Sequence, residues 1–331
     1  MSYESENFLP KETSVKDVLD LLSSIGYLKI QKPEIKLSGH IASFYWYEVN
    51  DYKSWTGVFC SVRKTEKEIV VYARTNLSRS YWDLMFHNKT IRELRKRFGG
   101  TFSTDEGTNR FLHPVGKPPI PEQSGCYLAY ERFHSNIGRA HVYLMNRAFP
   151  NKQWENVGVF SFLDEINPRL LSNNLLSPLL VAVTEDYFKS VFVCLLKSSD
   201  KKETFMKAGK ISSDHLLRIS NSELTVEEAI AETLSFQNIY AICRHFKTLN
   251  QALDLESELK KPYRKRKETL LSSIEGIVTR RHGFIHHGQM DTKFNDKDVL
   301  KAIGDIEESV RRFDKLLTKK YNWQPMAGYN Y

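Results

Sequence analysis

The pattern of apolar residues changes partway along the chain, and this change limits the folds that the sequence can adopt. Before about residue 150, short runs rich in aromatic and β-branched residues alternate with helical stretches. From Ser177 onward almost every segment has apolar residues at helical spacing, and we find no clear strand signal. The sequence therefore predicts an α+β domain over residues 1–158 and an all-α helical bundle over residues 159–331.

The first part of the chain carries helix and strand signals in turn. Ser14 is placed to cap a helix, and Gly99-Gly100 is placed to end one. The loop-rich stretch 101–123 holds four prolines, and Asn136 to Gly138 has the composition of a turn between two strands. We predict helices over 14–25 and 78–98, and strands over 40–49, 56–63, 68–73, 126–133 and 140–144.

The second part has the start signals of several helices. Ser177-Pro178 predicts a helix start, with a cap followed by proline at the first position. Thr225 and Glu228 form a capping-box pattern. We predict helices over 177–197, 225–248, 253–259, 265–285 and 296–320.

Composition sets broad limits on the class of protein. A net charge of +8 and a pI of about 9.1 favour anionic partners, nucleic acid among them. No two of the four cysteines have metal-ligand spacing, which indicates a reducing compartment. The acidic first residues do not resemble a signal peptide, and charges at Glu185, Asp186 and Lys189 interrupt the most apolar run, Leu175–Leu196. We therefore expect a cytoplasmic protein with no membrane span.

One stretch concentrates titratable side chains more than any other. Thr279–Gly288 holds three of the ten histidines and two arginines. An imidazole can exchange protons near neutral pH, and a guanidinium can grip a phosphate with two parallel donors. These groups suit the cleavage of a phosphodiester without a metal, so we expect no cofactor.

The spacing within this stretch affects how its residues can work together. Four residues separate Arg281 from His286. At about 100° per residue their side chains lie well apart around one helix. Two copies of the helix across a two-fold axis could bring them into one groove, which predicts a homodimer.

The hexapeptide Arg281-His282-Gly283-Phe284-Ile285-His286 resembles the Arg-x4-His motif of HEPN ribonucleases, most closely those of the RiboL-PSP type. The resemblance covers roughly Leu163–Tyr321. It implies that Arg281 binds the scissile phosphate, that His286 acts in acid–base catalysis, and that His282 orients them. The products would be a 2′,3′-cyclic phosphate and a 5′-hydroxyl. It also implies a bacterial toxin or abortive-infection effector that cuts RNA as a dimer, with a phage trigger or a neutralising partner.

Two further points bear on this resemblance. Relatives that are paired with a nucleotidyltransferase usually carry a tyrosine two residues after the histidine, and Gly288 stands there, which puts that mode of control in doubt. Glu185 is a candidate supporting acid, as acidic residues serve in some relatives.

Other cations are candidates for RNA binding. Arg280 and His287 flank the motif, and a basic run over 260–267 precedes it. We assign RNA binding within that run to Arg264, Lys265, Arg266 and Lys267. Each could instead be a solvated surface residue. Four aromatic residues could stack on bases, although such residues more often belong to a core: Tyr45, Trp46, Tyr47 and Trp55.

Three hypotheses remain open for the second part of the chain. It is a metal-independent endoribonuclease, or a non-catalytic module that binds RNA or nucleotide or serves for dimerisation. The third hypothesis is a metal hydrolase, because His282 and His286 have the i, i+4 spacing of a metal pair, although no third ligand is spaced to join them.

Overall fold

A computed structural model describes residues 2–31, 38–114, 116–148 and 166–323. The chain forms two compact units, a sheet unit over Met1–Ser124 and a helical unit over Gly125–Pro325. The prediction of an α+β part followed by a mostly helical part is confirmed at that level. The predicted boundary at 158/159 lies outside the described residues, whereas the two units divide between Ser124 and Gly125.

The sheet unit is built on a seven-stranded sheet in the order β2-β3-β4-β5-β1-β6-β7, with antiparallel neighbours. The predicted strands over 40–49, 56–63 and 68–73 are confirmed within a few residues as β3, β4 and β5. The strands are β1 (Tyr3–Leu9), β2 (Leu28–Lys29), β3 (His40–Trp46), β4 (Val58–Lys64), β5 (Ile69–Thr75), β6 (Thr101–Thr104) and β7 (Gly107–Thr108).

Strand β1 pairs with both β5 and β6, yet the sequence did not predict it. Its inward residues include Ser5 and Asn7, which are both fully buried. The amide of Asn7 donates to the Val71 carbonyl at 3.0 Å, and the Ser5 hydroxyl lies 3.0 Å from Nε2 of His87. Because these polar residues occupy core positions, the usual alternation of apolar and polar residues is absent from β1.

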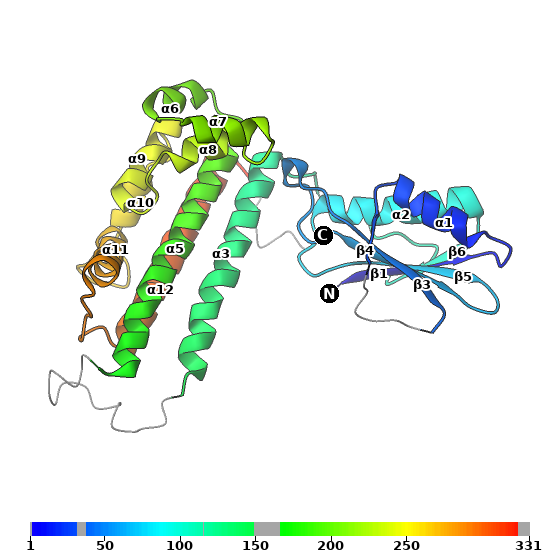
Figure 1. Ribbon diagram of the computed structural model, residues 1–331, viewed down its shortest axis with the longest axis horizontal. Helices are drawn as coiled ribbons and strands as arrows, with labels where there is room; N and C mark the ends of the chain where they lie inside the picture. The colour runs from blue at the N-terminus through cyan, green and yellow to red at the C-terminus, as the bar shows by residue number, and fades with distance from the viewer. Residues whose placement is uncertain (1, 32–37, 115, 149–165, 324–331) are drawn as a thin grey trace. The chain divides into compact units, whose positions relative to one another are not determined.

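Two helices, α1 (Val15–Ser24) and α2 (Tyr81–Phe98), lie on one face of this sheet (Figure 1). Ser14 caps α1, as predicted, and Ser80 forms a capping box with Asp83 at the start of α2. The chain leaves α2 at Gly99, whose φ of 75° suits glycine, as the sequence predicted. The core between sheet and helices includes Leu22, Phe44, Val62, Val71 and Leu94.

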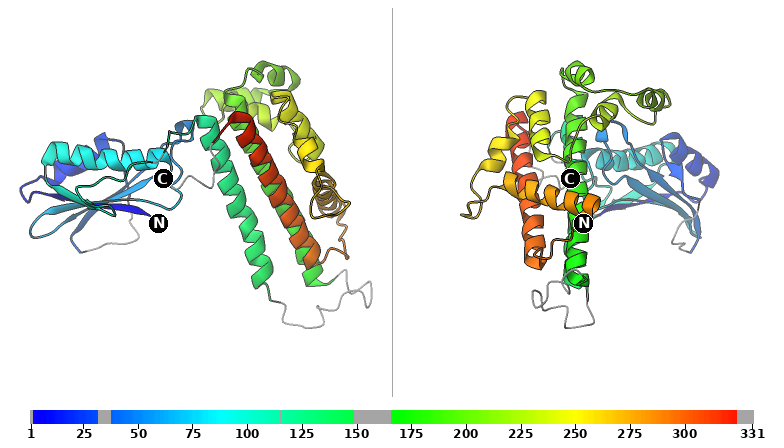
Figure 2. Two further views of the ribbon diagram at one scale, coloured as in Figure 1. Left: turned by 180° about the vertical axis from the view of Figure 1, so that it is seen from behind. Right: turned by 60° about the vertical axis from the view of Figure 1, so that its left-hand side comes forward.

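Three long helices of the helical unit run side by side, namely α3 (Pro121–Asn146), α5 (Pro168–Lys197) and α12 (Asp296–Tyr321) (Figures 1 and 2). Side-chain contacts join α3 to its neighbours: Arg132 forms an ion pair with Asp186 on α5, and Nε2 of His141 lies 3.5 Å from Oε1 of Glu307 on α12. The remaining helices in the described part of this unit are α6 (Lys202–Ala208), α7 (Ser213–Ser220), α8 (Val226–Glu232), α9 (Ile239–Leu249), α10 (Leu255–Lys260) and α11 (Leu270–His287).

The predicted strands over 126–133 and 140–144 are wrong, because this whole segment is part of α3. Its buried residues recur at three- and four-residue spacing, which is the period of a helix: Cys126, Ala129, Phe133, Ile137 and Ala140. The aromatic content suggested strands, but the spacing of the buried positions decides the structure. Helix α3 therefore belongs to the helical unit.

Helix starts are confirmed in two cases and wrong in two others. Thr225 caps α8 with the predicted capping box, and α12 begins at Asp296 as predicted. The single helix predicted over 225–248 is wrong, because α8 ends at Glu232 and a separate helix, α9, begins at Ile239 behind its own cap, Asn238. Helix α5 begins at Pro168, nine residues before Ser177, with Asn167 as its cap, so Pro178 lies inside the helix. Helix α11 begins at Leu270 behind its cap, Thr269, so most of the basic run lies in the loop before it.

Aromatic side chains fill the core of the helical unit. Phe188, Phe246 and Phe313, from α5, α9 and α12, lie with ring centroids 4.5 to 6.1 Å apart. In the described part of the chain, every helix is either too short or too polar to cross a bilayer.

Candidate functional site

Helix α11 carries the Arg-x4-His motif in its last two turns. Its first turns are anchored by Leu270, Leu271, Ile274 and Ile277, which are all at most 3% exposed. From Val278 to the end of the helix no side chain is fully buried. The helix ends because Gly288 adopts the left-handed conformation, with φ 62°. The motif therefore lies where the helix leaves the core.

Arg281 and His286 have no hydrogen-bond or ion-pair partner within the described residues. Arg281 is half-buried and His286 is exposed, and neither side chain makes a hydrogen bond or an ion pair there. Five positions along an α-helix turn a side chain by about 140° and advance it by about 7.5 Å. One chain therefore does not bring the two groups together, and this geometry agrees with the argument made from their spacing.

Three imidazoles gather at the C-terminal end of α11. The ring of His282 lies 4.6 Å from that of His286 and 5.4 Å from that of His287, centroid to centroid. His282 thus contacts both other histidines, and all three rings are exposed. Among the described residues, no three side chains of His, Cys, Asp or Glu are grouped to hold a metal ion.

Arg280 has partners inside the protein, unlike its neighbour Arg281. Its Nε donates to Oδ2 of Asp291 at 2.9 Å, and its guanidinium lies 3.9 Å from the ring centroid of Phe294. Asn174 of α5 binds the backbone of Asp291. Its side chain accepts a hydrogen bond from the Asp291 N–H and donates one to the Asp291 carbonyl. Arg280 therefore ties the motif helix to α5 through the segment after it.

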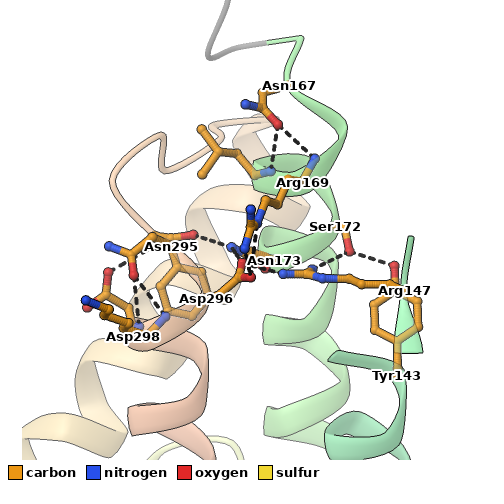
Figure 3. Close-up of polar contacts among 12 residues, drawn as sticks. Tyr143, Arg147, Asn167, Arg169, Ser172, Asn173, Asn295, Asp296 and Asp298 are labelled. Carbon is orange, nitrogen blue, oxygen red and sulfur yellow. Dashed lines mark hydrogen bonds and ion pairs between the residues drawn. The ribbon is translucent and has the colours of Figure 1, made fainter. Parts of the chain in front are cut away.

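The next residues of that segment enter a polar network at the ends of three helices (Figure 3). Asp296 accepts hydrogen bonds from Arg147, which directly follows α3, and from Arg169 and Asn173 of α5. Arg147 also donates to Ser172 at 2.8 Å. Burial raises the pKa of Asp296, but the hydrogen bonds from Arg169, Asn173 and Arg147 outweigh it and lower that pKa to about 2. This network fixes the start of α12 against α3 and α5.

A shallow hollow of about 510 Å³ opens beside the motif. Gly276 and Gly283 of α11 form part of its wall, and Gln289, Met290 and Asp291 form another part. A Cβ built on Gly276 meets nothing within 4 Å, so the space over this face of the helix is open. This hollow was not predictable from the sequence, because the segment that completes it folds back after Gly288.

The basic loop before α11 contains two kinds of cation. Arg266 is structural, because its Nη2 lies 2.6 Å from Oδ1 of Asp305, which is 2% exposed. The exposed side chains Arg264, Lys265 and Lys267 make no ion pair with a described residue. The guanidinium of Arg264 lies 5.0 Å from the ring centroid of Tyr263. Three of the four cations assigned to RNA binding thus remain available for it.

The candidate supporting acid, Glu185, lies half-buried on α5. Its neighbour Thr184 lines a small apolar cavity together with Ile277 and Val278 of α11. Within the described residues Glu185 itself makes no hydrogen bond or ion pair, with the motif or elsewhere. No contact therefore links Glu185 to Arg281 or His286.

The aromatic residues of the sheet unit fall into two groups. Trp46 stacks on Phe86 of α2 at 3.8 Å, and Trp55 is 8% exposed, so both belong to the interior. Tyr45 and Tyr47 stack on each other at 6.5 Å, and Tyr47 is 44% exposed. Of these four residues, only Tyr45 and Tyr47 leave ring surface available for stacking on a base.

No protein-family model, curated protein or solved structure that we compared with this chain matches it.

Proposed function

We propose that the helical unit is a metal-independent endoribonuclease of the HEPN type that works as a homodimer. The contrast between two neighbouring arginines is the main support. Arg280 is engaged by Asp291 and Phe294, whereas Arg281 makes no hydrogen bond or ion pair with a described residue. An arginine that stabilises the fold has partners of this kind. An arginine that binds substrate must have its N–H donors free for the substrate.

The chemistry assigned to the motif follows from its functional groups. Arg281 would hold two oxygens of the scissile phosphate and offset the charge that develops on them. His286 of one chain would take the proton of the ribose 2′-hydroxyl as its oxygen bonds to phosphorus. As the bond from phosphorus to the 5′-oxygen breaks, the leaving oxygen would take a proton from water, and the His286 imidazolium would return its proton to the solvent. The products are a 2′,3′-cyclic phosphate and a 5′-hydroxyl.

An exposed apolar stripe supports a second copy as partner. Leu171, Leu175 and Leu179 follow one another at i, i+4 and i+8 on α5 and are 42%, 56% and 40% exposed. Ile285, inside the motif, is 48% exposed. Helix α11 packs on α5, so these apolar side chains belong to the same pair of helices as the motif. A face of this kind is typical of an interface between copies of a chain.

The cellular role that we propose is that of a toxin or an anti-phage abortive-infection effector. The sheet unit would then select the RNA or sense a trigger. Expression in bacteria should arrest growth, and the Arg281→Ala or His286→Ala chain should not. Arrest that persists in both variants would contradict this role.

Incubation of purified chain with total RNA in EDTA tests the activity. Arg281→Ala and His286→Ala should each lower the cleavage rate by about 10² to 10⁴, the range typical of lost acid–base or charge-stabilising groups. Lys297→Ala is the matched control, because it removes one exposed charge from α12. Equal cleavage by all four proteins would refute the proposal, and so would cleavage that EDTA abolishes.

A non-catalytic dimerisation or RNA-binding module is the alternative, and the divergence of Arg281 and His286 within one chain favours it. Mixing the two inactive variants separates these hypotheses. If each site combines Arg281 of one chain with His286 of the other, mixed dimers regain part of the activity. A chain that dimerises, binds RNA and never cleaves it would establish the alternative.

A further inference from the structure

Helix α2 of the sheet unit has a strongly basic outer surface. Lys89, Arg92 and Lys96 follow one another at i, i+3 and i+7 on the side away from the sheet, and Arg95 and Arg97 flank them. All five side chains are exposed. From Lys89 to Lys96 the stripe is about 10 Å long at 1.5 Å per residue. We call these five residues the α2 basic surface.

No acid neutralises this surface. None of its five side chains makes an ion pair or a hydrogen bond with a described residue. Glu93 is the one acid among the nine residues from Lys89 to Arg97, and it is only half-exposed. A local excess of positive charge therefore faces solvent.

Helix stability does not explain this arrangement. The dipole of α2 favours the cations of its last turn, Arg95, Lys96 and Arg97. It does not favour Lys89 or Arg92, which lie in the middle of the helix. Like charges three and four positions apart destabilise a helix, and Arg92 has such neighbours at Lys89, Arg95 and Lys96. Helix stability alone therefore does not account for the charge at Lys89 and Arg92.

Two of the guanidinium groups are held in place by aromatic rings. Arg92 lies 5.3 Å from the ring centroid of Phe111, and Arg95 lies 5.3 Å from that of Phe102. These two rings are 4.7 Å apart, and Phe102 is fully buried in the sheet unit. Stacking uses the face of a guanidinium and leaves its N–H donors free for phosphate oxygens. Less side-chain entropy is then lost on binding.

We propose that the α2 basic surface binds the phosphate backbone of RNA and so recruits the RNA that the helical unit cuts. This inference rests on the proposed ribonuclease function. An anionic lipid surface fits less well, because a membrane-bound helix inserts its apolar face into the bilayer. The apolar face of α2 is in the core of the sheet unit, where Leu84, Ile91 and Leu94 are fully buried.

Recruitment by one unit raises the concentration of RNA near the other unit of the same chain. The gain applies only to RNA long enough to contact both units at once. Loss of the α2 basic surface should therefore raise KM for a long RNA and leave kcat unchanged. Cleavage of a four-nucleotide substrate should not change.

The binding experiment uses the full chain and a 30-nucleotide 2′-O-methyl RNA, which cannot be cut by attack of a 2′-hydroxyl. Kd is measured by fluorescence anisotropy from 50 to 200 mM salt for wild type and for the triple variant Lys89→Gln, Arg92→Gln, Lys96→Gln. The matched control removes the same charge from exposed lysines elsewhere on the sheet unit, with Lys11→Gln, Lys64→Gln and Lys67→Gln. Circular dichroism confirms that both variants fold.

Three lost phosphate contacts should reduce the slope of log K against log salt by about 2, at about 0.7 per contact on a single strand. The α2 variant should bind at least tenfold more weakly than wild type at 50 mM salt, and the control less than twofold more weakly. Equal losses in the two variants would overturn the inference. Unchanged RNA binding with lost binding to phosphatidylserine vesicles would also overturn it and assign the surface to lipid.

Failure of the inference can be told apart from failure of the proposed function. The Arg281→Ala chain should lose cleavage and keep RNA binding that depends on the α2 basic surface. If the wild-type chain binds RNA through the α2 basic surface but never cleaves it, the proposed nuclease activity alone is refuted. A chain that cleaves long RNA with the same KM in the α2 variant would refute the recruitment alone.

Discussion

Arg266 was predicted to bind RNA, but its contacts lead us to expect that its loss mainly destabilises the helical unit. Its Nη2 lies 2.6 Å from Oδ1 of Asp305 on α12, and the Ser273 hydroxyl donates to Oδ2 of the same carboxylate at 2.5 Å. Asp305 is 2% exposed, so loss of Arg266 leaves a buried carboxylate without its charge partner. Arg266 thus joins the loop before α11 to α12.

The size of the effect follows from this burial. Removing one partner of a buried ion pair typically costs about 3–5 kcal/mol, because the remaining charge is left without compensation. The Arg266 side chain is 20% exposed and the Ser273 hydroxyl remains, so we expect a value near the lower end, about 3 kcal/mol. For a unit of about 200 residues this corresponds to a fall in Tm of about 6–12 °C.

Thermal unfolding of Arg266→Ala, followed by circular dichroism at 222 nm, measures this loss. Lys267→Ala is the matched control, because Lys267 is exposed and makes no ion pair with a described residue. Replacing both partners together, with Arg266→Met and Asp305→Leu, should restore most of the stability, since no buried charge then remains.

An Arg266→Ala chain that melts within 2 °C of wild type would refute this reasoning. If that chain also bound RNA more weakly, Arg266 would belong with Arg264, Lys265 and Lys267 on the RNA-binding surface.

Three further predictions concern pH. Hydrogen bonds to Asp296 lower its pKa from 3.8 to about 2 despite burial, so Asp296→Asn should cost about 2 kcal/mol at pH 7 in urea unfolding. That loss should shrink as pH falls from 4 toward 2, and a constant loss would contradict it. Burial raises the pKa of Asp314 from 3.8 to about 6, so this carboxyl reduces stability as pH rises through that range. Asp314→Asn should therefore be more stable than wild type at pH 7.5, by up to about 3 kcal/mol in the free energy of unfolding. At pH 4 the two chains should be about equally stable. Burial lowers the pKa of His87 from 6.5 to about 4, so the sheet unit should lose up to about 3 kcal/mol of stability as pH falls from 6.5 to 4. Fluorescence of Trp46, Trp55 and Trp82 in urea should report this loss, and His87→Gln should flatten it.

Elements with local signals were predictable from the sequence. Ser14 and Thr225 cap helices through hydrogen bonds to backbone N–H groups three residues on, and Gly99 ends α2 with a positive φ. Such bonds join residues that are close in the sequence, so the pattern alone indicates them. The α+β character of the first part and the helical character of the second followed from hydrophobic periodicity in the same way.

Elements whose character depends on distant partners were not predictable in this way. Strand β1 has polar side chains inside because Val71 and His87 satisfy them. The segment Cys126–Leu144 is rich in aromatic residues, but it is helical, and its buried Phe133 packs on Tyr187 of α5 with ring centroids 5.5 Å apart. In both cases tertiary contacts override local composition.

The same distinction holds for the candidate site. The sequence by itself determined that arginines and histidines are concentrated at the end of a helix, since chain position fixes which residues adjoin. Only the tertiary structure decided which of these cations are engaged. Asp291 and Phe294 engage Arg280, and Asp305 engages Arg266, while Arg281 and Lys267 beside them make no such contact with a described residue. The physical reason is that a charge becomes structural only when folding brings a distant partner to it and removes water from both.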